Sequence, residues 1–344
     1  MVQKKTLLHM GGVLLALVGA ASPLQAARQL IPLDVELDDV SVNKVPFLIA
    51  ADNGLYAKNG LAVHQLINAE AAAVARSRGV NVPAQNIAAA TVAGAPITIG
   101  GGSWMIARIG TPEQVSPQRI IVSTTEGIVR DHLIAVPGIT GIQDLKGKRI
   151  GVSAFGAVVH YSSLALAKKL GWDLQKDIVL VTGSANLNAL RTGKADAVLA
   201  SALVAGGVTS EMGLTDLGSL STYGIPLAGS GINVEAKWLA AHRDITERFI
   251  KAAIQATARM KTDRQVFDAA VIKWFNVKDR KTLDRMYAAT AEIPDKPYPA
   301  VAGIEGAMAV YDTPNMRTHS AAEFYDSSFI AKLDKSGFLD HPLK

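Results

Sequence analysis

The stretch 144–171 constrains the fold of this chain more than any other segment. An apolar run at 149–152 follows the turn residues 146–148, which predicts a short buried strand. Apolar residues then recur on one helical face, and Gly171 stands where a helix is expected to end. Residues 153–156 are therefore predicted to form a strand-to-helix turn. In an open α/β sheet such a turn lies at the carboxyl end of a strand and offers backbone N–H groups to a ligand.

Further segments follow the same strand and helix order. Residues 31–42 alternate apolar and polar side chains, which predicts a half-buried strand, and Pro46 fits the first turn of the helix that comes next. A helix predicted at 86–93 precedes an apolar strand and the glycine run 100–102. The segment 186–199 repeats this helix, glycine and strand order, and the repeat indicates two lobes of like construction.

Composition limits the class of protein. The chain has 344 residues, enough for two domains, and 49% of them are hydrophobic. It has no cysteine, which excludes disulfides, zinc–thiolate sites and a thiol nucleophile. The formal charge of +5 is not gathered into basic runs, so no nucleic-acid partner is expected.

Residues 1–26 have the three parts of a secretory signal peptide. Lys4 and Lys5 precede an apolar stretch at 7–17, and small residues lead to Ala26. The alternative is a membrane anchor, but the apolar stretch is shorter than the roughly 20 residues that span a bilayer. We expect cleavage after Ala26, export to a bacterial periplasm, and a soluble mature protein.

Two runs of sequence carry a family resemblance. The run 45–63, VPFLIAADNGLYAKNGLAV, resembles the opening of the nitrate/sulfonate/taurine group of ABC-transporter substrate-binding proteins, the SsuA/THI5-like or NMT1 group. The run 94–103, GAPITIGGGS, resembles the strand and glycine loop of that group, although Pro96 stands where the family usually has an acidic residue. The later copy retains an acid at Asp196.

The resemblance implies an α/β fold of the periplasmic binding protein type II class. In this class two Rossmann-like lobes enclose a ligand cleft, and the chain crosses between the lobes twice through a hinge. We therefore expect one discontinuous lobe from residues 27–128 and 232–344, and a second lobe from 129–231. The hinge is expected between Thr124 and Asp131.

The expected ligand site consists of residues that follow predicted strands at their carboxyl ends. They are Asn43, Lys44, Gly102, Ser103, Trp104, Ser153, Phe155 and Gly156, with Ser201 and Asn233 as weaker additions. The glycines and the helix start after Gly156 are expected to leave backbone donors for a ligand oxygen. Lys44 either meets an anionic ligand or lies in a solvated loop, and Trp104 either stacks on a flat ligand or packs between lobes.

These observations favour an exported solute-binding protein rather than an enzyme. None of the seven histidines has a metal-binding spacing, and His160 is interpreted as a packing residue. No cofactor or metal is expected. The partners expected are a small anionic, carboxylated or planar organic ligand and the permease of an ABC importer, with the protein itself a monomer. The alternative is an enzyme on the same scaffold, either thiamine-pyrimidine synthase-like or a lyase or dehydratase, which turnover by the purified protein would reveal.

Overall fold

The computed structural model describes residues 29–38, 41–67, 69–77, 79–87, 94–109, 118–201, 205 and 213–344. The predicted signal peptide at 1–26 and the helix predicted at 86–93, apart from its first two residues, lie outside this part of the chain. Within it, no helix combines the length and apolar character needed to cross a membrane.

The described residues form two mixed sheets with helices around them. The strands are β1 (Ile31–Leu37), β2 (Leu61–Ile67), β3 (Ile97–Gly101), β4 (Arg119–Thr124), β5 (His132–Ala135), β6 (Arg149–Gly151), β7 (Val179–Val181), β8 (Ala197–Ala200), β9 (Thr215–Ser219) and β10 (Ser230–Glu235). The helices are α1 (Val45–Asp52), α2 (Leu55–Lys58), α3 (Ala69–Ser77), α4 (Gly102–Ile109), α5 (Val158–Lys169), α6 (Leu187–Arg191), α8 (Ala236–Ala241), α9 (Arg243–Thr262), α10 (Arg264–Phe275), α11 (Arg280–Ala289), α12 (Val301–Val310) and α13 (Ser328–Lys335).

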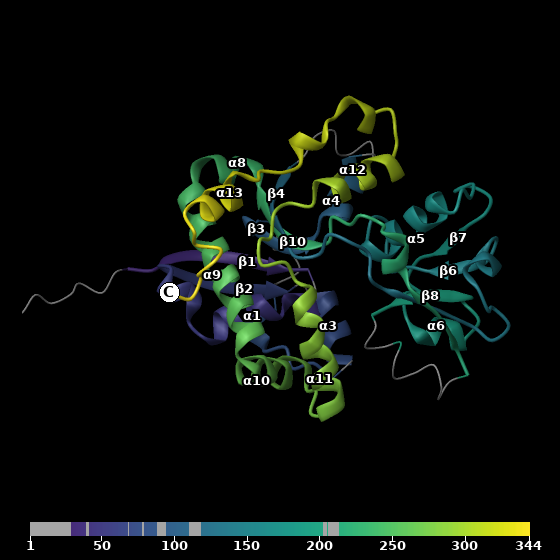
Figure 1. Ribbon diagram of the computed structural model, residues 1–344, viewed down its shortest axis with the longest axis horizontal. Coiled ribbons are helices and arrows are strands. Elements are labelled where there is room, and N and C mark those ends of the chain that lie inside the picture. The colour runs from purple at the N-terminus through teal and green to yellow at the C-terminus, as the bar shows by residue number, and fades with distance from the viewer. Residues whose placement is uncertain are drawn as a thin grey trace, which may run out of the picture.

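The two sheets have the same topology. Sheet 1 has the order β2-β1-β3-β10-β4, and sheet 2 has the order β7-β6-β8-β5-β9. In each sheet the three strands that begin the order are parallel, and the fourth strand is antiparallel to both of its neighbours. Sheet 2, drawn in teal, stands apart from sheet 1 in Figure 1. The α/β class and the like construction of the two halves are confirmed.

Local sequence signals account for the elements that lead into the predicted site. Along β1, Leu33, Val35 and Leu37 are buried on one face, as the alternation predicts. Helix α1 has Pro46 in its first turn, and the left-handed residue Gly54 follows its end with a φ of 64°. These signals place the β1–α1 loop at the carboxyl edge of sheet 1.

Two antiparallel connections join the sheets. The chain leaves sheet 1 after β4 through residues 125–131 and returns to β10 through residues 220–229. The amide of Val129 donates to the carbonyl of Ile225 at 3.0 Å, and the amide of Leu227 donates to that of Gly127 at 2.9 Å. We call these two paired segments the crossover. The lobe boundaries predicted around it, at 128/129 and 231/232, stay a prediction.

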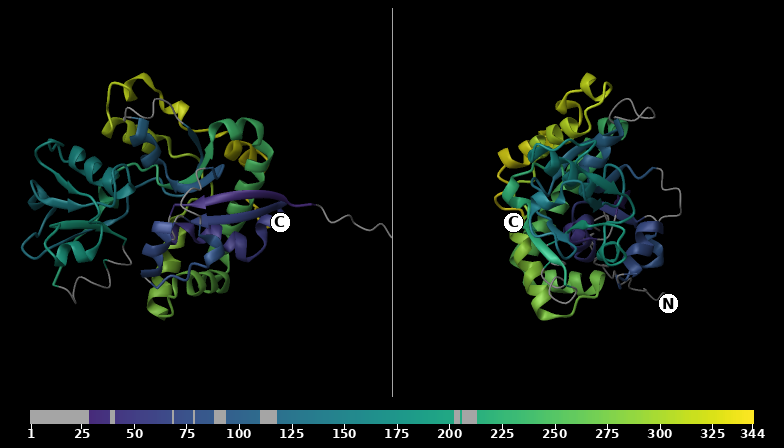
Figure 2. Two further views of the ribbon diagram at one scale, coloured as in Figure 1. Left: turned by 180° about the vertical axis from the view of Figure 1, so that it is seen from behind. Right: turned by 90° about the vertical axis from the view of Figure 1, so that its right-hand side faces the viewer.

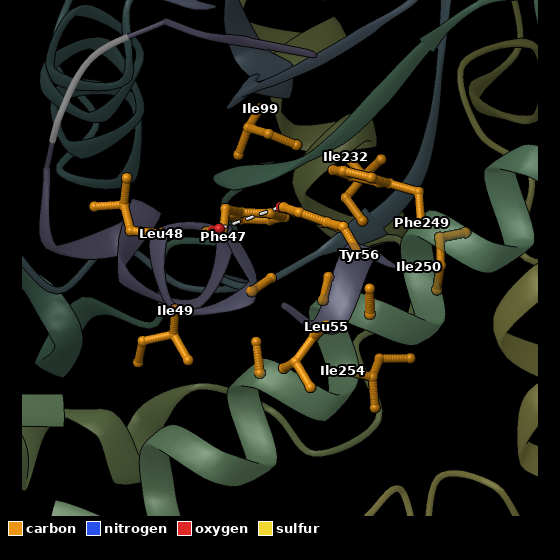
Figure 3. Close-up of a cluster of buried hydrophobic side chains, with 14 of the residues drawn as sticks. Phe47, Leu48, Ile49, Leu55, Tyr56, Ile99, Ile232, Phe249, Ile250 and Ile254 are labelled. Atoms are coloured by element: carbon orange, nitrogen blue, oxygen red, sulfur yellow. Dashed lines mark hydrogen bonds between the residues drawn. The ribbon is translucent and has the colours of Figure 1, made fainter. Parts of the chain in front are cut away.

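Each sheet has its own buried cluster. The first cluster lies between sheet 1 and helices α1, α9 and α10, and Figure 3 shows part of it. There the rings of Tyr56 and Phe249 stack with centroids 5.3 Å apart, and the Tyr56 hydroxyl donates to the Phe47 carbonyl at 3.2 Å. The second cluster joins sheet 2 to α4, α5 and α12. The two views of Figure 2 show how the helices surround the sheets.

Helix α12 lies against both α4 and α5, although it is far from them in sequence. Two glycines allow this close packing. A Cβ atom on Gly303 would lie 2.1 Å from the backbone carbon of Leu227, and one on Gly306 would lie 2.6 Å from the Tyr161 hydroxyl. The predicted division assigns α12 to the first lobe, yet its Ile304 belongs to the buried cluster of sheet 2.

Candidate functional site

The turns that follow β3 and β6 meet, although they belong to different sheets. The Ser103 hydroxyl donates to the Gly156 carbonyl at 3.3 Å. Gly156 has a φ of 77°, and a Cβ atom on it would lie 2.8 Å from Cβ of Ala107 and 3.3 Å from Cα of Trp104. Glycine is thus required at this position both for backbone conformation and for close approach. The structure brings together Ser103, Trp104 and Gly156 of the predicted site.

The β3–α4 turn differs from the sequence-based expectation in one respect. Gly102 was expected to leave its backbone donor for a ligand, as was the helix start after Gly156; the amide of Gly102 and that of its neighbour Ser103 are both engaged. Both amides instead donate to the carbonyl of Ala228 on the returning crossover segment, at 2.9 and 3.2 Å. The start of α4 is therefore occupied by the protein's own backbone, and both residues are buried.

The β6–α5 turn is more open. Ser153 and Phe155 are exposed, and Phe155 retains 49% of its accessible surface. Helix α5 begins after Ala157, whose side chain makes no capping hydrogen bond. An uncapped helix start presents backbone N–H groups and the positive end of the helix dipole, which favours an acidic or oxygen-bearing group. The role of this turn in ligand binding stays a prediction.

Lys44 lies at the start of α1 and is only 3% exposed. Its ammonium group is 2.9 Å from Oδ1 of Asp38 and donates to the Ser230 hydroxyl at 2.9 Å. The alternative of a solvated loop is therefore wrong for Lys44, whereas its contact with an anionic ligand stays a prediction. Burial of an ammonium group is costly unless it is paired, and Asp38 and Ser230 supply that pairing.

Acidic groups surround this lysine on the crossover side. Burial raises the pKa of Glu126, whereas the Ser230 amide, the charge of Lys44 and the Asn43 side chain lower it. Burial, followed by the nearby charge of Glu126, raises the pKa of Asp131 to about 6. Asn43 of the predicted site thus contacts Glu126, and the first loop is tied to the crossover through its polar side chains.

Aromatic side chains flank the β6–α5 turn. The Phe155 ring meets the rings of His160 and Tyr311 edge-on at centroid distances of 5.1 and 5.6 Å. His160 bonds the Tyr311 hydroxyl through Nδ1 at 3.0 Å, and burial lowers its pKa. This agrees with the packing role expected for His160. Trp104 is 45% exposed, and the guanidinium of Arg108 lies 4.6 Å from its ring centroid.

The two weaker candidates lie in different surroundings. Ser201 follows β8 and is exposed, and its carbonyl accepts a hydrogen bond from the amide of Ala205 at 3.0 Å. Asn233 is 2% exposed inside sheet 1, where its Nδ2 donates to the Gly100 carbonyl at 3.0 Å. Its Oδ1 is buried and has no hydrogen-bond partner within the described part of the chain. Within the part of the chain that the structure describes, no hydrogen bond joins Ser201 to the other turns.

Sequence reasoning missed four residues that shape the site: Asp38, Glu126, Ser230 and Tyr311. Asp38 packs closely against Gly100, since a Cβ atom on Gly100 would be 2.4 Å from its Oδ2. Its position one residue beyond β1 could have suggested it. Ser230 and Tyr311 lie too far along the chain for any local pattern to connect them to Lys44 or His160.

Among the described residues, no three His, Asp or Glu side chains are grouped so as to hold a metal ion.

Part of the chain matches the model of a known family. Residues 116–265 match the family described as NMT1/THI5 like. The stretch includes both segments of the crossover, all of sheet 2 and helices α8 and α9. The resemblance expected from the sequence is confirmed. Comparison with curated proteins finds no match.

Solved structures share the fold of this chain. The nitrate-binding protein NrtA from Synechocystis PCC 6803 is 10% identical, with a TM-score of 0.65 over 90% of each chain. The putative sulfonate-binding protein SsuA from Methylobacillus flagellatus KT is 14% identical, with a TM-score of 0.63 over 91% of this chain and 97% of that one. The desulfurization enzyme DSZB is also 14% identical, with a TM-score of 0.56 over 89% and 99%. These likenesses confirm the periplasmic binding protein fold.

Proposed function

We propose that this protein is an exported solute-binding protein that captures a small organic molecule between its two sheets and delivers it to the permease of an ABC importer. The observation that carries the proposal is the meeting of Ser103 and Trp104 from sheet 1 with Gly156 from sheet 2 beside the uncapped start of α5. A ligand that touches both turns would hold the two halves of the molecule together.

The ligand that suits this place has an acidic group and a planar or partly apolar body. Exposed Ser153 and the first amides of α5 would bind the acidic group. The exposed rings of Trp104 and Phe155 would contact the body. Because Asp38 already neutralises Lys44, the α5 turn rather than the lysine supports an anionic or carboxylated ligand. SsuA and NrtA, which have this fold, are described as binding sulfonate and nitrate.

We propose that the protein binds its ligand without turning it over and that it is a monomer. We also propose that a signal peptide at 1–26 is removed on export to the periplasm. DSZB shows that the fold also serves an enzyme. The two functions differ in an observable way, because a binding protein returns its ligand unchanged. Mass spectrometry of the ligand after prolonged incubation with the purified protein distinguishes them. The mass of the exported protein tests the cleavage after Ala26.

The site is tested on protein purified from the periplasm without unfolding. Native mass spectrometry identifies any co-purified ligand, and a thermal-shift series with nitrate, taurine, alkanesulfonates and benzoate supplies one otherwise. Calorimetric titration with that compound should show binding weakened roughly ten- to a hundredfold in Ser153→Ala, since a hydrogen bond to a charged group is lost. Trp104→Ala should also bind more weakly, and exposed Ser221→Ala is the control. Unchanged affinity in both Ser153→Ala and Trp104→Ala would reject this site.

A further inference from the structure

A cavity of about 400 Å³ lies on the opposite side of sheet 1 from α4. Helix α9, the ends of β4 and β10, the segment 293–297 and the C-terminal residues 339–342 enclose it. Its volume is within the range of small-molecule sites. None of the residues predicted for the ligand site lines it.

The walls of this cavity are mainly apolar. Phe47, Ile232, Ile250 and Ile254 contribute side chains from the buried cluster drawn in Figure 3. Three prolines in the segments that close the cavity add rigid apolar surface. An apolar surface of this kind favours a molecule with an apolar body, because water leaves both surfaces on binding.

One polar group in the wall has an unused hydrogen-bonding capacity. Ser123 is 3% exposed and pairs with Ile232 across the β4–β10 ladder, so its side chain lies on the same face as that of Ile232. Ser123 lines the cavity, and within the described ranges its hydroxyl has no hydrogen-bond partner. A buried hydroxyl that opens onto a cavity can donate to or accept from a bound molecule.

The charges at the rim are matched within the protein. The Lys261 ammonium lies 2.6 Å from Oδ1 of Asp295, and the Lys296 ammonium lies 2.6 Å from Oδ1 of Asp334 and 3.3 Å from Oδ1 of Asp340. The rim therefore carries no excess positive charge to attract an anion. Charge complementarity favours a neutral occupant.

The cavity also borders the crossover. Thr125 lines it, and both the amide and the hydroxyl of Thr125 donate to the Ser230 carbonyl, at 2.7 and 2.8 Å. Ser230 in turn accepts from Lys44. A molecule in the cavity would thus contact a residue that joins the outgoing and returning connections between the sheets.

We propose that this cavity is a second small-molecule site, separate from the turns of the proposed solute site. Its ligand class is a neutral molecule with an apolar body and one hydrogen-bonding group directed at Ser123. Through Thr125 the bound molecule stabilises one arrangement of the crossover, so the site acts as an effector site. This inference does not depend on the identity of the transported solute.

N-phenyl-1-naphthylamine is a suitable probe, since it is neutral, apolar, carries a single N–H group and fluoresces in apolar surroundings. Titration of the exported protein should give saturable fluorescence with one equivalent bound. Thr262→Trp, at an exposed position in the rim, should weaken binding more than tenfold by blocking entry, and Ala258→Phe should do the same by filling the cavity. Ser123→Ala should weaken it about two- to tenfold, the value of one neutral hydrogen bond.

Ala289→Phe adds the same ring to an exposed position of α11 and serves as the matched control, with unchanged probe affinity. Circular dichroism and thermal melting establish that each variant is folded, and Thr262→Trp carries the test if Ala258→Phe is not. The proposal is overturned if the probe shows no saturable binding. It is equally overturned if folded Thr262→Trp and Ser123→Ala both bind the probe as the unaltered protein does.

Discussion

The turn after β3 and the turn after β6 occupy different sheets, but each joins a parallel strand to a helix that packs beside the other's helix. At the first turn Gly102 and Ser103 donate their amides to Ala228, and both residues are buried. At the second turn Ser153 and Phe155 are exposed and α5 is uncapped. The difference indicates that the two turns have different roles. The first turn holds the returning segment of the crossover in place, and the second remains available to a ligand.

The largest expected effect is at the closed turn. A Cβ atom on Gly102 would lie 2.7 Å from Cδ1 of Ile121 and 3.1 Å from Cβ of Ala228. Gly102→Val therefore overpacks the buried contact between the start of α4 and these two residues. We expect a loss of about 3 kcal/mol in the free energy of unfolding, measured by urea denaturation. Ala154→Val, at an exposed position of the open turn, should change it by less than about 0.5 kcal/mol. Equal losses in the two variants would remove the distinction between the turns.

A smaller loss is expected where the two turns touch. Gly156→Ala forces a non-glycine residue into a left-handed conformation and places its methyl group 2.8 Å from Cβ of Ala107. We expect about 2 kcal/mol of destabilisation in thermal or urea unfolding. Gly171→Ala is the control, because it has the same left-handed strain with no atom within 4 Å of the added methyl group. If Gly171→Ala is as destabilising, the contact between the turns contributes nothing.

The crossover should respond to pH, because burial raises the pKa of Asp131 to about 6. The ordinary pKa of this carboxyl is 3.8. Between pH 3.8 and about pH 6 the folded protein therefore binds more protons at Asp131 than the unfolded chain does. Stability is therefore lost as the pH rises through this window and is constant above it. Asp131→Asn should flatten this decline and gain about 1.5 kcal/mol at pH 7, less than the full shift because the attraction to His132 is also lost.

Urea unfolding of both proteins at pH 4.5, 5.5 and 7 measures this difference. Glu126 has a raised pKa too, so part of the decline should persist in the variant. The groups that act on Asp131 are the charges of Glu126 and His132. Parallel pH profiles of the two proteins would contradict the assignment.

The smallest effect separates two serines in equivalent positions. Ser103→Ala removes a buried hydroxyl that donates to Gly156, and we expect about 1 kcal/mol of destabilisation. Ser153→Ala alters an exposed side chain and should leave the free energy of unfolding within about 0.5 kcal/mol. Ser153→Ala should therefore affect ligand affinity alone. A destabilised Ser153→Ala protein would show that the open turn is also structural.

Local sequence patterns predicted the elements well where a short-range cause determines them. The alternation in β1, Pro46 at the start of α1 and Gly171 after α5 each act within a few residues, and the structure has each as expected. The residues Ser320 and Glu323 form a capping box, which is a local helix-start signal, but it begins a short 3-10 turn rather than α13. The reason is that a cap satisfies the first turn only, whereas helix length depends on packing.

The site was harder to predict because its partners are distant in sequence. Lys44 was recognised as a candidate, but Ser230, which accepts its hydrogen bond, lies 186 residues away. The Ala228 carbonyl that occupies the start of α4 likewise comes from the returning connection. A single sequence indicates which residues follow a strand, and it does not indicate which of their polar groups the rest of the chain satisfies.

The position of α12 has a consequence for the order of folding during synthesis. Both sheets are complete in sequence at Glu235, whereas the helix that packs against α4 and α5 begins only at Val301. A chain that emerges from its N-terminus can therefore form each sheet before the element that joins them exists. Contacts between α12 and α4 also close a very long loop, which makes them slow to form. A nascent chain ending before Val301 would hold two folded halves that are connected by the crossover and by the contact of α4 with α5, without the further contacts of α12.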